Sequence, residues 1–254
     1  MSPYKKEYLD LPAELREMIM HEYLLVEHDR KGVQEYPDVL TTTSLPPLAH
    51  TCKQVYDEVR LLVLRHTSRV ELRHDDGQQI PDLCPSTQFR QSLAPFPGNR
   101  ALAAVKHLSF PHMQPVHGPE NASVELAMAC RNLRRLDMTI HAENLYRCSL
   151  YTLWVKVPLT TRQVVQSFYL QGLLECKGLE EVRLDGVYRR PSAGGVPEDL
   201  EPLVGLGKWI MTGLGGERAG KDPVVVELVR RWAVLEFGEL VPSERVMFAA
   251  DMLG

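Results

Sequence analysis

The sequence predicts an α+β protein in which an N-terminal helical module precedes helix-strand units that repeat irregularly. Two observations predict this class. The first part of the 254-residue chain carries apolar residues at helical spacing. The later part contains three similar segments with apolar residues at the same relative positions, and helix-like stretches precede two of them. We expect the strands of these segments to form one sheet that is covered by helices.

The first predicted helix begins at Pro12, because proline suits the first turn of a helix, where its missing N–H would have no partner. Leu15, Met18 and Ile19 form an apolar stripe, and Arg16 lies mainly away from it. Few residues precede this helix, so two interpretations stay open: the stripe packs inside the molecule, or it is exposed and binds a partner. The partner-binding residues in the second case are Leu11, Pro12, Leu15 and Ile19.

A second helix is predicted in the segment LPPLAHTCKQVYDEVRLLVLRHTS, and we expect it to pair with the first. Its apolar stripe consists of Leu48, Cys52, Val55, Val59 and Leu62, at four- and three-residue intervals. Because Cys52 belongs to this stripe, we expect a small buried hydrophobic residue there rather than a nucleophile beside His50. The segment SRVEL that follows is predicted to be a short strand.

The chain is divided into a helical module over residues 9–73, a connecting loop over 74–100 and a repeat-like α/β domain over 101–254. The boundary is placed at PDLCPSTQFRQSLAPFPGNR, because a stretch rich in proline, serine and glutamine is typical of a loop.

The three similar segments are AVKHLSF (104–110), NLRRLDM (132–138) and GLEEVRL (178–184). Their apolar residues occupy relative positions 1, 4 and 6: Val105, Leu108 and Phe110; Leu133, Leu136 and Met138; Leu179, Val182 and Leu184. The last two of each set point to one face of a strand, so Arg135 and Arg183 should point to the other face. The helix-like stretches are SVELAMAC and TTRQVVQSFYLQGLLECK.

Further elements are predicted toward the end of the chain. YTLWVKV (151–157) is predicted to be a strand, and the glycine-rich PSAGGVPEDLEPLVGLG is predicted to be mostly loop. Asp222 and Pro223 are expected to start a helix in which Val225, Leu228 and Val229 share a face. Ser243 is expected to cap a short last helix through Ala250.

Charge and cysteine content restrict the classes of partner. Twenty-nine Lys and Arg against 33 Asp and Glu give a net charge of −4, which argues against binding to nucleic acid or to anionic lipid. Five widely spaced cysteines suggest reduced thiols in a cytoplasmic or nuclear protein. The first residues lack the apolar region of an export signal, and no apolar run approaches the roughly 18 residues of a membrane span.

No catalytic, cofactor or metal site is predicted. In GLGKWIMTGLGG the glycines resemble a phosphate loop, but the spacing to Gly-Lys-Ser/Thr is missing, which favours a flexible loop or helix end. His107, His112 and His117 recur every five residues, but this spacing alternates faces on a strand, so we expect surface histidines rather than zinc ligands. An enzyme with a scattered site is the least supported class.

The N-terminal segments LPAELREMIMHEYLL and LPPLAHTCKQVYDEVRLLVLRHTSRVEL resemble the F-box-like region of many filamentous-fungal proteins. The matching residues are Leu11, Pro12, Glu14, Leu15 and Ile19 in the first helix, and Leu48, Thr51, Cys52, Lys53, Gln54, Tyr56 and Glu58 in the second. The insertion from Val26 to Ser44 is longer than an ordinary F-box allows. The strand segments that follow resemble the degenerate leucine-rich-repeat-like regions that often accompany such boxes.

This resemblance implies a non-catalytic protein-interaction protein. Its helical module would dock on a Skp-type adaptor and so couple a cullin-type ubiquitin ligase to a protein target held by the C-terminal region. The alternative is a scaffold or binding subunit of a nuclear or cytosolic complex with no ubiquitin-ligase link, in which the box is only the helical cap of a larger fold. Neither interpretation involves a cofactor, nucleic acid or a membrane.

Overall fold

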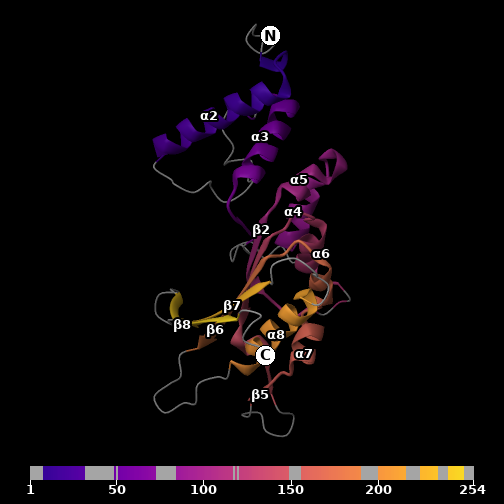
Figure 1. The fold of residues 1–254 in the computed structure, drawn as a ribbon, viewed down its shortest axis with the longest axis vertical. Helices are drawn as coiled ribbons and strands as arrows, with labels where there is room; N and C mark the ends of the chain where they lie inside the picture. Colours follow the sequence, from indigo (N-terminus) through magenta and orange to yellow (C-terminus); the bar gives the residue numbers. More distant parts are fainter. Residues whose placement is uncertain are drawn as a thin grey trace.

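A six-stranded sheet forms the centre of the molecule, and helices line one side of it (Figure 1). The computed structural model describes residues 8–31, 49, 51–72, 84–116, 118, 120–148, 156–189, 200–215, 224–233 and 240–248. The strands of the large sheet are β1 (Val70–Glu71), β2 (His107–Met113), β3 (Arg135–His141), β6 (Glu181–Arg189), β7 (Val225–Ala233) and β8 (Leu240–Phe248), in this order. All neighbours are parallel except β7 and β8, which are antiparallel. The strands β4 (Tyr146–Cys148) and β5 (Lys156–Pro158) form a separate two-stranded sheet.

Helices connect the parallel strands, so helix and strand alternate along the chain. The helical elements are α4 (Pro85–Leu93), η2 (Pro97–Asn99) and α5 (Arg100–Ala104) before β2; α6 (Ala122–Ala129) before β3; η3 (Ala142–Leu145), α7 (Thr161–Ser167) and η4 (Leu170–Glu175) before β6; and α8 (Glu201–Gly215) before β7. Helices α4 to α8 lie along the same side of the sheet (Figure 1). The predicted mixture of helices and a sheet is confirmed, and the sheet is mainly parallel.

The three repeat segments form β2, β3 and β6, as predicted, and they stand in register. Leu108 pairs with Leu136, and Leu136 pairs with Val182. The apolar residue at relative position 1 of each segment closes the turn before the strand by donating its N–H to the carbonyl three residues earlier. These turn bonds are Val105 to Leu102 at 3.3 Å, Leu133 to Cys130 at 2.9 Å and Leu179 to Cys176 at 3.0 Å. All nine predicted apolar residues are buried on the helix side.

Gly178 lies in the turn before β6, where two consecutive units approach closely. A Cβ atom on Gly178 would lie 2.9 Å from the carbonyl oxygen of Leu133, which real Cβ atoms do not tolerate. The absence of a side chain therefore lets the third repeat turn pack on the backbone of the second.

The N-terminal helices α2 (Ala13–Lys31) and α3 (Lys53–His66) pair with each other, as predicted. Their apolar cluster is separate from the main core and contains Met20, Ala49, Val55, Val59, Leu62 and Val63. The pair lies beyond the β1 end of the sheet (Figure 1). The predicted short strand is β1, and the predicted stripe residue Leu48 lies outside the described residues.

The expectation that Cys52 is fully buried within the second helix is wrong, although Cys52 does pack against the apolar cluster of the helical pair. Cys52 is the N-cap residue of α3, with extended backbone at φ −162° and ψ 162°, and its side chain is only half-buried. Helix α3 begins at Lys53, because the extended backbone of Cys52 interrupts the helical conformation.

The predicted connecting loop over 74–100 is wrong from Pro85 onward, where the chain forms α4, η2 and α5. Residues 73–83 lie outside the described part. Pro85 occupies the first turn of α4, where proline is favoured, and Phe89, Leu93 and Phe96 are buried in the main core. The polar residues between these apolar positions lie on the outer side of an amphipathic helix.

Two helices predicted near the end of the chain are strands. Residues 225–233 form β7, and the region predicted to start a helix at Ser243 lies in β8. Consecutive β-branched valines lose side-chain freedom in a helix, and β7 forms an unbroken parallel ladder with β6. The predicted strand 151–157 is confirmed at its end by β5, while residues 151–155 lie outside the described residues.

The segment predicted to be a glycine-rich loop enters a helix, α8, at Glu201. Gly207 faces β7: a Cβ atom there would lie 3.2 Å from Leu228 and 3.4 Å from Val226. The glycine therefore allows α8 to approach the sheet closely, which offsets the low helix propensity of glycine. Residues 191–199 lie outside the described residues.

Candidate interaction surfaces

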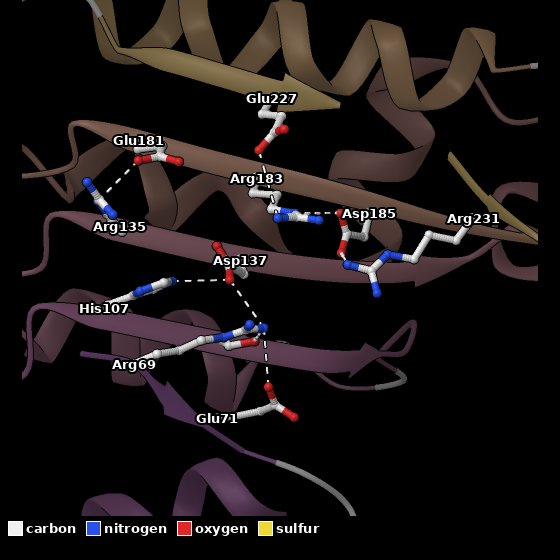
Figure 2. A network of polar contacts seen from close by, with 11 residues as sticks. Arg69, Glu71, His107, Arg135, Asp137, Glu181, Arg183, Asp185, Glu227 and Arg231 are labelled. Atoms are coloured by element: carbon white, nitrogen blue, oxygen red, sulfur yellow. Dashed lines mark hydrogen bonds and ion pairs between the residues drawn. The ribbon is translucent and has the colours of Figure 1, made fainter. Parts of the chain in front are cut away.

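The face of the sheet opposite helices α4 to α8, here called the open face, carries a network of charged side chains (Figure 2). Parallel sheets are usually covered by apolar contacts on both faces, so a polar second face is unusual. One row of residues crosses five strands at a single register level. It consists of Glu71, Ser109, Asp137, Arg183 and Glu227.

Asp137 is at the centre of the first part of this network. Its carboxylate lies 3.1 Å from His107 Nε2 and 3.2 Å from a terminal nitrogen of Arg69, which also lies 3.2 Å from Glu71. Burial alone would raise the pKa of Asp137, but the contact with His107 and the charges of Arg69 and Arg183 outweigh burial and hold the pKa below its ordinary value. Asp137 is therefore ionised and held between cationic groups.

Asp185 is the corresponding centre on β6. Arg183 donates to one carboxylate oxygen at 2.9 Å, and Arg231 lies 2.6 Å from the other. Burial alone would lower the pKa of Arg183, but Asp185 and Glu227 outweigh burial and raise it. The Asp185 side chain is only 7% exposed, whereas Arg231 is 29% exposed. The carboxylates of Asp137 and Asp185 are thus more buried than the guanidinium groups that contact them, which extend toward solvent.

The Arg135–Glu181 pair lies at the more exposed, N-terminal end of the strands. Its atoms approach to 3.1 Å, and the side chains are 61% and 38% exposed. The predicted outward direction of Arg135 and Arg183 is confirmed, since both belong to the open face.

The second surface is the exposed apolar face of α2. Leu15, Met18 and Ile19 are 45%, 64% and 45% exposed. Of the predicted partner-binding residues, Pro12 is also exposed and Leu11 is half-buried. The apolar stripe therefore does not pack inside the described part of the molecule.

Arg16 fixes the opposite side of α2 against α3. Its guanidinium donates to both carboxylate oxygens of Glu58, at 2.7 to 3.2 Å, and to the carbonyls of Leu9 and Leu11. The residue is only 9% exposed. Sequence patterns missed this role because an arginine on a helix is normally assigned to the solvent-exposed side. Its position away from the apolar stripe was the one signal that it could contact another helix.

The remaining candidates from the sequence are the possible phosphate loop in residues 205–216 and the histidines His107, His112 and His117. Within the described ranges, no group of three or more His, Cys, Asp or Glu side chains could hold a metal ion. Gly205, Gly207 and Lys208 lie inside α8 rather than in a phosphate-binding loop. His117 lies outside the described residues, while His107 contacts Asp137 and His112 contacts His141 on the next strand.

Two further properties concern thiols and membranes. Burial raises the pKa of Cys130 to about 12 and that of Cys176 to about 11, so these thiols are poor nucleophiles. Among the described helices, none combines the length and apolar character needed to cross a membrane.

Comparisons of this chain with family models, with curated proteins and with solved structures give no match.

Proposed function

We propose that this protein is a non-catalytic substrate-recognition subunit of a cullin-type ubiquitin ligase, acting in the cytoplasm or nucleus. In this proposal α2 docks on a Skp-type adaptor, and the open face of the sheet holds a protein target. The observation that carries the proposal is the exposed apolar face of α2, formed by Leu15, Met18 and Ile19.

The geometry of the helical pair supports this role. The Arg16–Glu58 contacts and the buried Met20 hold one side of α2 against α3. The other side leaves Leu15, Met18 and Ile19 exposed, and interfaces concentrate their binding free energy in a few such anchors. An adaptor groove that accepts Leu15 and Ile19, one helical turn apart, would cover this face.

The open face supports the second half of the proposal. Charged residues from β1, β3, β6 and β7 stand side by side there, and their ion pairs are partly exposed. Such an array fits a folded protein or peptide that presents complementary charges.

The adaptor half of the proposal is tested by the double variant Leu15→Glu with Ile19→Glu. It should lose binding to a purified Skp-type adaptor from the same organism, while its melting temperature stays close to that of the wild type. The matched control is Met128→Glu, an exposed apolar residue on α6 that should keep binding. Adaptor binding that survives the double substitution, or a wild-type chain that binds no adaptor at low salt, contradicts the ligase role.

A second candidate is a scaffold subunit with no ligase link, in which the helical pair caps the sheet. This alternative is favoured by α3, because Leu64 is buried in the main core and Leu61 packs against it. It predicts that the purified chain forms a stable complex without adaptor or cullin, which affinity purification and mass spectrometry from the native host would detect.

A further inference from the structure

Two histidines meet at the end of β2 and β3. His112 Nδ1 lies 3.3 Å from His141 Nε2, and the two rings are nearly parallel, with centroids 5.5 Å apart and an interplanar angle of 19°. His112 is exposed and His141 is half-buried.

A β-bulge brings the pair together. Leu108 and Phe110 point toward the helices, so strict alternation would send His112 to the same side. The register between β2 and β3 shifts between Phe110 and Met113, and Met113 is the residue buried on the helix side. The extra residue therefore aims His112 at the open face, where His141 also points, and bulges often re-aim a side chain in this way near a binding site.

The nitrogen separation matches that of two ligands on one metal ion. Imidazole nitrogens bind zinc at about 2.0–2.1 Å, so two of them at a tetrahedral angle stand about 3.3 Å apart. Imidazole suits zinc, nickel and copper alike. No third His, Cys, Asp or Glu of the described residues completes a group of three, so water would fill the other positions.

We propose that His112 and His141 form a two-histidine site for a divalent late transition-metal cation at the C-terminal end of the open face. The bound cation would cross-link β2 and β3 at the bulge. This site is independent of the proposed ligase role, because it uses neither α2 nor the ion pairs of the open face.

The test is calorimetric titration of the untagged full chain with Ni²⁺ at neutral pH. Two ligands on one scaffold bind as a chelate, so His112→Asn and His141→Asn should each weaken the affinity by at least about tenfold. The matched control is His21→Asn, since His21 belongs to the other histidine pair, where the rings of His21 and His66 are tilted by 54°. This control should bind Ni²⁺ like the wild type.

Thermal melting gives a second readout. Ni²⁺ should raise the melting temperature of the wild type and of His21→Asn, because a ligand that binds the folded state stabilises it, and this increase should be smaller for His112→Asn. His112 is exposed, so this variant keeps the fold and is sufficient by itself. Unchanged Ni²⁺ affinity in His112→Asn, or no binding by the wild type, overturns the proposal.

Discussion

Leu136 and Arg135 are adjacent on β3 but lie on opposite faces of the sheet. Leu136 is fully buried, whereas the Arg135 side chain is 61% exposed. We expect Leu136→Ala to lower the free energy of unfolding by about 2–5 kcal/mol, because it leaves a cavity in the core. Arg135→Ala should change it by less than about 0.5 kcal/mol. Urea denaturation measures both values, and equal losses would contradict the assigned strand faces.

Glu58 gives the stability of the helical pair a pH dependence. Burial alone would raise the pKa of Glu58, but hydrogen bonds from Arg16 and Gln54 outweigh burial and hold the pKa below its ordinary value. A carboxyl group whose pKa is lower in the folded state contributes stability above its unfolded value of about 4.3. This contribution is lost as the pH falls through the folded-state pKa.

We therefore expect Glu58→Gln to be less stable than the wild type at neutral pH, because Arg16 loses its ionised partner. The difference should shrink as the pH falls below about 4, where Glu58 itself becomes neutral. Urea denaturation of both proteins across this range measures the difference. Asp137 also has a lowered pKa but is present in both proteins, so its titration cancels. A difference that does not depend on pH would contradict the ion-pair assignment.

At the scale of elements, the turn before β6 depends on Gly178. An added methyl group would meet the carbonyl oxygen of Leu133 at 2.9 Å, and backbone atoms cannot move aside cheaply. We expect Gly178→Ala to lower the free energy of unfolding by about 1–3 kcal/mol. Gly118→Ala is the matched control, since nothing lies within 4 Å of its added Cβ atom. Thermal melting that shifts equally for both variants would show that the close approach carries no strain.

The strands β2, β3 and β6 could be predicted because the same spacing of apolar residues specifies both the turn before each strand and the buried face of the strand. The first apolar residue of each segment closes the turn, and the next two point into the core, as Val105, Leu108 and Phe110 do. Helix α3 was predictable for a similar reason, since Val55, Val59 and Leu62 share one buried stripe.

The elements that sequence patterns assigned wrongly depend on tertiary contacts. The spacing of Val225, Leu228 and Val229 fits a helix face as well as a strand, and the ladder with β6 decides between them. The glycines of α8 suggest a loop from sequence alone, because the close approach of the helix to β7, which favours glycine at Gly207, is not visible in the sequence. The ion pairs of the open face join strands that are distant in sequence, so single-segment patterns do not reveal them.

At the scale of the whole molecule, the two apolar clusters have different extents. Among the residues whose burial the structure describes, the cluster of the helical pair contains six buried residues, whereas the main core includes residues from β1 to β7 and the helices α3 to α8. Chains open locally where few apolar contacts are buried, so α2 should open before the sheet does. Native-state hydrogen exchange should therefore find faster exchange for amides in the middle of α2 than for those of β3 and β6. Equal protection would mean that the two clusters unfold as one unit.

Because the parallel strands stand in register, the residues of the open face recur at a regular spacing across the sheet. Each helix-strand unit adds one strand, and neighbouring strands lie about 4.8 Å apart, so each unit adds one residue position to a row across the sheet. The residues in the central row are Glu71, Ser109, Asp137, Arg183 and Glu227. The antiparallel strand β8 follows β7 and ends the parallel part of the sheet. Loss or gain of one unit would shorten or lengthen this row by one residue position while leaving the spacing of the others intact, so the number of units sets the width of the open face.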